Sequence, residues 1–215
     1  TVLLSTIDEE VDRLDRVVGN LLDMSRLQSG VLRVHREQAL VEEVFASAVA
    51  SLGLGPDQVD IATLRNLPPV LVDDALLERA IANVLANAAA VQPRGIPILI
   101  TGRVPVPDTG PVGLPRKGST DGPGAGEPQS VVELCISDLG PGMSVGDREL
   151  AIQPFQRLGD SDGHAGVGLG LAIASGLTAA IGGELELGET PGGGLTVTFR
   201  LPTTGSDGES DPSPT

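Results

Sequence analysis

Lysine, cysteine and the large aromatic residues are scarce in this chain of 215 residues. It has one lysine (Lys117), one cysteine (Cys135), three phenylalanines, and neither tryptophan nor tyrosine. A single cysteine excludes an intramolecular disulfide, and its place in the alternating run VVELCISD predicts a small core residue on a strand. The formal net charge of −15 argues against a basic surface that binds nucleic acid or anionic lipid.

Long hydrophobic runs are also missing. No apolar stretch reaches the roughly 20 residues that a membrane-spanning helix needs. The first residues, TVLLSTIDEEVDRLDR, carry acids where a signal peptide has basic charge. We therefore expect a soluble piece in the cytoplasm, with one compact domain and an appendage.

The first thirty residues have the period of a helix that packs on other helices. Apolar residues recur at alternating spacings of three and four, which is typical of the seam of a helix bundle. These residues are Leu4, Ile7, Val11, Leu14, Val18 and Leu21. Gly30 is expected to end the helix, and the partner of its seam is expected outside this sequence or in another copy.

The rest of the chain alternates helical and strand-like patterns. Helices are expected over about 41–52, 73–90, 146–153 and 168–181, and strands over 31–35, 59–62, 97–104, 130–138, 184–189 and 195–201. The segment NLPPVLV is expected to be a turn, and TPGGG to connect the last two strands. This order predicts an α+β fold, a two-layer sandwich in which helices cover one face of a mixed sheet.

Two segments have the composition of irregular structure. Residues 105–129 are rich in proline and glycine and have no period, so we expect a flexible, exposed loop between two strands. The acidic end TTGSDGESDPSPT, residues 203–215, is expected to be a disordered tail. The expected units are therefore a bundle helix at 1–30, a folded domain at 31–202 and this tail.

Two groups of polar and glycine residues could bind a ligand. Asn83 and Asn87 are four apart on a helix and share one face, where their amide oxygens suit a hard cation such as Mg²⁺. They could equally be two surface asparagines. Asp138 ends a strand and is followed by Gly140 and Gly142, which would let a flat base approach the backbone while the carboxylate accepts from its amine. A plain acidic turn is the alternative.

Two further motifs follow these. Phe155, after a short helix, is expected to anchor a loop by hydrophobic packing. Gly166, Gly168 and Gly170 alternate directly before an apolar helix, where backbone N–H groups and the positive end of the helix dipole would suit a phosphate. The other interpretation is a simple turn.

In this order the four motifs resemble the N, G1, F and G2 boxes of bacterial sensor histidine kinases, within the superfamily that includes gyrase, Hsp90 and MutL. The phrases LLDMSRLQSG and PVLVDDALLERAIANVLANA are most similar to the potassium-responsive KdpD-type kinases. The resemblance extends from residue 1 to about 202. It implies the Bergerat, or GHKL, ATP-binding sandwich at 31–202, preceded by the second helix of a dimerisation and phosphotransfer region.

The resemblance also implies roles for single residues. Asn87 would hold Mg²⁺, Asn83 would lie beside the phosphates of ATP, and Asp138 would bind the adenine amine in a pocket shaped by Gly140 and Gly142. Residues 143–165 would form a lid with Phe155 packing its base. The remaining residues implied in nucleotide binding are Gly166, Gly168, Leu169, Gly170 and Thr196.

For the whole protein, the resemblance implies a kinase that moves the γ-phosphate of ATP to a histidine and then to an aspartate of a response regulator. Potassium or osmotic sensing, a homodimer and a membrane-associated parent are implied as well. His35 and His164 lack the motif of a phospho-acceptor, so the piece is expected to bind ATP without phosphorylating itself.

The sequence departs from the family beside the second asparagine. Ala90 and Val91 stand where the family commonly has a cation and a tyrosine, which favours the alternative of a degenerate module that binds nucleotide weakly or not at all. An ATPase of the superfamily has a glutamate four residues before its metal-binding asparagine, but here that residue is Asn83. An anti-sigma serine kinase is disfavoured by the bundle helix.

Overall fold

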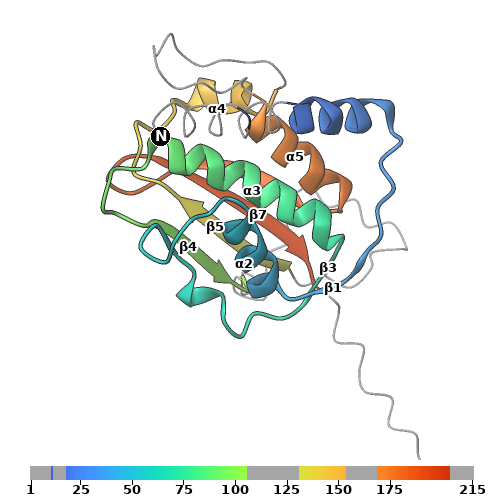
Figure 1. The fold of residues 1–215 in the computed structure, drawn as a ribbon, viewed down its shortest axis with the longest axis horizontal. Coiled ribbons are helices and arrows are strands. Elements are labelled where there is room, and N and C mark those ends of the chain that lie inside the picture. The colour runs from blue at the N-terminus through green and yellow to red at the C-terminus, as the bar shows by residue number, and fades with distance from the viewer. Residues whose placement is uncertain (1–10, 12–17, 106–130, 154–168, 204–215) are drawn as a thin grey trace, which may run out of the picture.

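The computed structural model describes Val11 and residues 18–105, 131–153 and 169–203, and a five-stranded sheet forms its centre (Figure 1). Across the sheet the strands are β2 (Val59–Asp60), β4 (Ile98–Arg103), β5 (Val131–Ser137), β7 (Leu195–Pro202) and β6 (Glu184–Glu189). Strands β2 and β4 are parallel, and every other neighbouring pair is antiparallel. The expected mixed sheet is confirmed.

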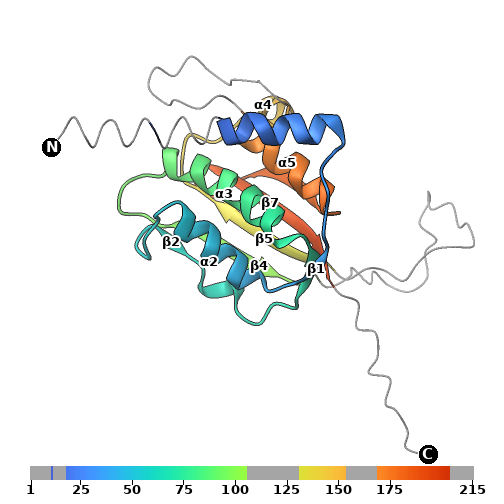
Figure 2. The same ribbon diagram turned by 45° about the vertical axis from the view of Figure 1, so that its right-hand side comes forward.

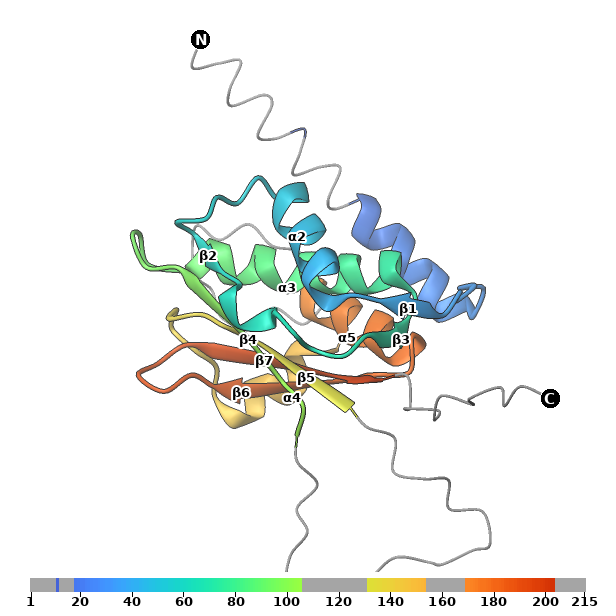
Figure 3. The same ribbon diagram turned by 90° about the horizontal axis from the view of Figure 1, so that it is seen from below.

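Helices cover one face of this sheet. They are α2 (Val41–Ser51), α3 (Asp74–Val91) and α5 (Gly170–Ala180), and the view from below shows them as a second layer (Figure 3). The short α4 (Val145–Ala151) follows β5 along the chain. The two-layer α+β sandwich is therefore confirmed. None of the described helices is long and apolar enough to cross a membrane.

Alternating and helical patterns build the core between the two layers. In β7 every second side chain is buried against the helices, from Leu195 through Phe199 to Leu201. In α3 the buried stripe includes Leu77, Ile81, Val84, Leu85 and Ala88. Helix α3 begins behind Asp73, whose carboxylate accepts the N–H of Leu76 at 3.1 Å.

A separate two-stranded sheet corrects two expectations. Strand β1 (Glu37–Ala39) pairs antiparallel with β3 (Val70–Val72), whereas the sequence predicted a strand at 31–35 and a turn at 66–72. Val70 and Val72 are fully buried, and Val70 also bridges to Thr203 beyond β7. These short strands therefore owe their form to tertiary pairing rather than to a long local pattern. The strand expected at 59–62 also ends earlier, because Ala62–Leu64 form the 3-10 helix η1.

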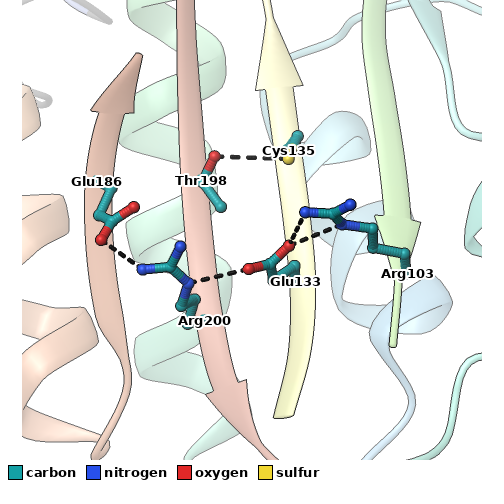
Figure 4. Close-up of polar contacts among 6 residues, drawn as sticks. All are labelled: Arg103, Glu133, Cys135, Glu186, Thr198 and Arg200. Carbon is teal, nitrogen blue, oxygen red and sulfur yellow. Dashed lines mark hydrogen bonds and ion pairs between the residues drawn. The ribbon is translucent and has the colours of Figure 1, made fainter. Parts of the chain in front are cut away.

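The open face of the sheet carries a charged network. Glu133 in β5 lies between Arg103 in β4 and Arg200 in β7, and it is only 6% exposed (Figure 4). Arg103 Nε donates to Glu133 Oε2 at 2.7 Å, and Arg200 Nε donates to Oε1 at 2.9 Å. Arg200 also pairs with Glu186. The hydrogen bonds from Arg200 and Arg103 lower the pKa of Glu133.

Cys135 belongs to the same open face, so the prediction of a core residue was wrong. Its neighbours Leu134 and Ile136 take the core positions, and Cys135 Sγ lies 3.5 Å from Thr198 Oγ1 (Figure 4). The alternation in this strand was recognisable, but it did not by itself show which of the two sets of alternating side chains faces the helices.

The N-terminal helix, residues 18–29, packs on the domain beside α5 (Figure 2). Asp23 is 3% exposed and pairs with Arg79 of α3, and Met24 is buried as well. Leu27 lies so close to α5 that a Cβ on Gly176 would be 2.8 Å from its Cδ1. Burial raises the pKa of Asp23, against the opposing charges of Arg79 and Arg26.

The helix therefore docks through a face that its sequence period did not single out. Val18 and Leu21 of the predicted seam stay exposed, at 53% and 44%. The remaining residues of the predicted bundle helix, except Val11, lie outside the described residues, as do 106–129 of the predicted loop and 204–215 of the predicted tail. The division of the chain at residue 30 stays a prediction.

Candidate functional site

Asp138 is fixed at the end of β5 by backbone hydrogen bonds. Its own N–H donates to the Leu195 carbonyl at 3.0 Å. Its Oδ1 accepts from the N–H of Gly140 at 2.8 Å and from the N–H of Leu195 at 3.1 Å. The residue is 5% exposed, and no ion pair within the described ranges includes it. Both donors bind Oδ1, and Oδ2 accepts no hydrogen bond from a described residue.

The loop after Asp138 lies so close to α3 and to the β6–β7 hairpin that its glycine positions leave little or no room for a Cβ. A Cβ on Gly140 would lie 2.6 Å from Cγ2 of Val91, the last residue of α3. Gly194 has a φ of +101°, and a Cβ there would collide with the Asp138 carbonyl oxygen. Gly142 lies beside the backbone of Gly194. Glycine is thus required by close backbone approach on both sides of the carboxylate.

Asn83 and Asn87 lie one turn apart on α3, as the sequence predicted. Asn83 Nδ2 donates to the Arg79 carbonyl at 2.9 Å, so one of its amide hydrogens is used within the helix. Asn87 is exposed and borders the first turn of α5, since a Cβ on Gly170 would lie 2.9 Å from its Nδ2. The fold therefore brings the second asparagine to the N-terminus of α5.

Helix α5 begins without a capping side chain. Leu169 occupies its N-cap, and a leucine side chain cannot accept a hydrogen bond from the first-turn N–H groups. The positive end of the helix dipole lies beside Asn87, because Gly170 in the first turn faces the Asn87 side chain. A helix end of this kind, flanked by an amide side chain, suits an anionic group.

Not every predicted residue joins this arrangement. Thr196 alternates with the buried Leu195 and Val197, so its side chain lies on the open face of the sheet. Its Oγ1 is within 2.9 Å of both Ser137 Oγ and Thr190 Oγ1. It is Leu195 whose backbone N–H contacts Asp138. The predicted residues Phe155, Gly166 and Gly168 lie outside the described part of the chain.

A cavity of about 260 Å³ lies next to the loop, on the side of α4 and the β6–β7 hairpin. Its lining includes Met143, Arg148, Glu189 and Gly193, but neither asparagine nor Asp138. Arg148 Nε donates to the Met143 carbonyl at 3.1 Å, which holds α4 against the loop. The cavity therefore borders the Asp138 loop through Gly142 and Gly194, but its lining does not include Asp138 or either asparagine.

Gln92 is a residue of the site that the sequence did not indicate. It follows α3 directly, and its Oε1 accepts the N–H of Leu139 at 2.9 Å. A long amide side chain just before Pro93, at the end of a helix, was the available signal. The partner is 47 residues away in sequence, however, and no local pattern reports such a contact.

Residues 72–205 match the family of histidine kinase-, DNA gyrase B- and HSP90-like ATPases, a span that includes both asparagines, Asp138 and α5. This chain belongs to that family. The resemblance inferred from the four motifs is confirmed, and so is the fold that it implied.

Two relatives of this HATPase family member are sensor kinases. The sensor protein KdpD of Rathayibacter rathayi is 40% identical over 92% of this chain and 20% of its own length. KdpD of Mycobacterium tuberculosis is 35% identical over 93% of this chain and 21% of its own length. The chain thus spans about a fifth of the length of these relatives.

Among solved structures, full-length ShkA in complex with AMPPNP has the same fold. The TM-score is 0.63 at 23% identity, over 93% of this chain and 38% of ShkA. The aligned 93% of this chain is more than residues 72–205 of the HATPase match, so the likeness to ShkA extends to residues before 72.

Proposed function

We propose that this chain is the ATP-binding catalytic region of a KdpD-like sensor histidine kinase, and that Asp138 binds the adenine amine. The observation that carries the proposal is the buried Asp138 carboxylate, held by two backbone donors on Oδ1. An exocyclic amine is a donor, so it would bind the remaining Oδ2. Next to it, Gly140 packs directly on Val91, which holds the loop of Asp138 against the end of α3.

The opposite end of the site fits a triphosphate with a divalent cation. Asn87 supplies a neutral amide oxygen, and such oxygens suit Mg²⁺, which also takes phosphate and water oxygens. No cluster of three or more His, Cys, Asp or Glu side chains forms a metal site in the described ranges, so phosphate oxygens would complete the shell. Bound there, Mg²⁺ would neutralise part of the phosphate charge. The start of α5 would place backbone N–H groups on the same phosphates.

The chemistry proposed for the whole protein is phosphoryl transfer rather than hydrolysis. The residue four before Asn87 is Asn83, whose amide cannot act as the general base that an ATPase needs to activate water. The parent would pass the γ-phosphate to a histidine outside this chain and then to a response-regulator aspartate. We propose that it works as a cytoplasm-facing homodimer of a membrane-associated sensor for potassium or osmotic stress.

Calorimetric titration with MgADP and with the magnesium complex of AMPPNP tests the nucleotide site. We expect micromolar binding that disappears in Asn87→Ala, because the amide oxygen for the cation is lost. Gln38→Ala is the matched control, since it removes an exposed amide from β1, outside the arrangement of α3 and α5. Failure of the wild-type chain to bind either nucleotide would contradict the proposal.

The degenerate module remains a second candidate because of two side chains. Ala90 is exposed and uncharged, and Val91 packs against Gly140, so neither offers a cation to the phosphates. A charge-assisted contact contributes about 1.5–3 kcal/mol, so its absence would weaken binding roughly tenfold to a hundredfold. Binding that survives Asn87→Ala, or no binding at all, would favour this candidate. Steady release of phosphate by the chain alone would favour an ATPase.

A further inference from the structure

Gln92 connects three segments that surround Asp138. Its backbone N–H donates to the Ala88 carbonyl at 2.9 Å, which closes the last turn of α3. Its side-chain Nε2 donates to the carbonyls of Ile96 at 3.1 Å and Pro97 at 3.0 Å, at the entry to β4. Its Oε1 accepts the N–H of Leu139 at 2.9 Å. One amide side chain thus holds the end of a helix, the start of a strand and the loop after β5.

The bond to Leu139 acts on the peptide group that follows Asp138. On the other side of Asp138, its own N–H is held by the Leu195 carbonyl. The next N–H along the loop, that of Gly140, is held by the Asp138 carboxylate itself. Gln92 therefore supplies the contact to Leu139 that ties the carboxylate-bearing loop to α3.

Helix α3 also carries Asn87, five residues before Gln92. The Gln92 bond therefore fixes the loop of Asp138 relative to the helix of Asn87. If the proposed function holds, this bond sets the spacing between the group that binds the base and the group that holds the cation.

From these contacts we propose that Gln92 is a positioning residue for adenine recognition. It does not contact the nucleotide; it holds the Leu139 N–H and thereby the orientation of Asp138. Loosening this bond lets the carboxylate turn away from the base amine. Loss of this hydrogen bond weakens the selection of the base more than the binding of the phosphates.

Gln92→Met tests the proposal, because methionine has nearly the same length and offers no comparable hydrogen bonds. Calorimetry with ATP and ITP, which carries a carbonyl in place of the adenine amine, measures base selection at a temperature well below unfolding. We expect the ATP-to-ITP affinity ratio to fall about fivefold to tenfold, as the loss of one hydrogen bond implies. Gln38→Met is the control and should leave the ratio unchanged.

Gln92→Glu separates the two functions of the side chain. A carboxylate still accepts the Leu139 N–H but cannot donate to the Ile96 and Pro97 carbonyls. Its added negative charge affects ATP and ITP equally, so it cancels in the ratio. We expect the wild-type ratio in this variant, whether or not its melting temperature falls.

Amide hydrogen exchange gives a readout that needs no nucleotide. The Leu139 amide should exchange about tenfold faster in Gln92→Met than in the wild type, and at the wild-type rate in Gln92→Glu. An unchanged ATP-to-ITP ratio in Gln92→Met would overturn the role of Gln92 and leave the proposed function intact. A wild-type chain that binds neither nucleotide would overturn both.

Discussion

Glu133 and Asp138 are two buried carboxylates five residues apart, and their surroundings differ completely. Glu133, on the open face of the sheet, binds an arginine with each of its oxygens. Asp138, beyond the same strand, binds two backbone N–H groups with one oxygen and forms no ion pair with any described residue. Both oxygens of the first carboxylate are paired, whereas the second has one oxygen, Oδ2, that accepts nothing from a described residue and that the proposed function assigns to the adenine amine.

The comparison predicts that Glu133 contributes to stability and not to binding. Glu133→Ala removes the carboxylate from between Arg103 and Arg200, and we expect a loss of about 2 to 3 kcal/mol in the free energy of unfolding. The value lies below that of a fully enclosed pair because the Arg103 side chain is 74% exposed. Urea denaturation measures the loss, and nucleotide affinity should stay within about twofold. A large drop in affinity with little loss of stability would reverse the comparison.

The dependence of stability on pH sharpens the comparison by adding Asp23. Glu133 has a lowered pKa, so its contribution is present above its ordinary value of 4.5 and is lost as the pH falls through the lowered value. Asp23 has a raised pKa, so ionising it costs stability as the pH rises from its ordinary value of 3.8 through the raised one. Relative to wild type, Glu133→Gln should therefore become less stable as the pH rises, and Asp23→Asn more stable.

Urea denaturation of each variant and the wild type between about pH 3 and 7 measures how the difference in free energy of unfolding changes with pH. If this difference changed with pH in the same direction for both variants, burial alone, and not the partners of each carboxylate, would decide its contribution to stability.

Asp23→Asn should give the smallest change at neutral pH. Asp23 Oδ2 is buried and accepts no hydrogen bond from a described residue, so asparagine removes the cost of burying a charge without breaking a hydrogen bond there. Arg79 is 44% exposed, so water solvates its guanidinium when the charge of its partner is gone. We expect a change within about 1 kcal/mol in the free energy of unfolding. A loss as large as that for Glu133→Ala would mean that the two ion pairs are equivalent.

The sequence predicted those features that depend on local patterns. The stripe of α3 from Leu77 to Ala88 and the alternation in β7 placed the sheet and its helices. The order of the four motifs, through the family resemblance, implied that Asn87 and Gly170 belong to one nucleotide site, and the structure brings the two residues together. What it missed depends on contacts between distant segments. Three-residue strands such as β1 and β3 form because they pair, and the contact between Gln92 and Leu139 spans 47 residues.

The face of the sheet to which a strand side chain points was the second source of error. The pattern of β5 showed alternation, but Cys135 was assigned to the core without knowing which of the two alternating sets of side chains faces the helices, and Thr196 was taken from the family resemblance without regard to the alternation in β7. Both lie on the open face, where Thr196 binds Ser137 and Thr190 instead of lining the site. The burial of Glu133 and of Asp23 was not predictable either, because the local sequence around a polar residue does not show which distant residue pairs with it. The docking of the N-terminal helix through Leu27 likewise depends on a distant segment, α5.

Asp138→Asn, titrated with ATP and with ITP, tests whether the Asp138 carboxylate binds the adenine amine. Asparagine Oδ1 can still accept both backbone N–H groups, so the free energy of unfolding should change by less than about 1 kcal/mol. Its amide, however, presents a donor where the carboxylate presented an acceptor. We expect the wild-type chain to prefer ATP and the variant to lose about tenfold or more of this preference, toward ITP. An unchanged preference for ATP in Asp138→Asn would contradict this role of the carboxylate.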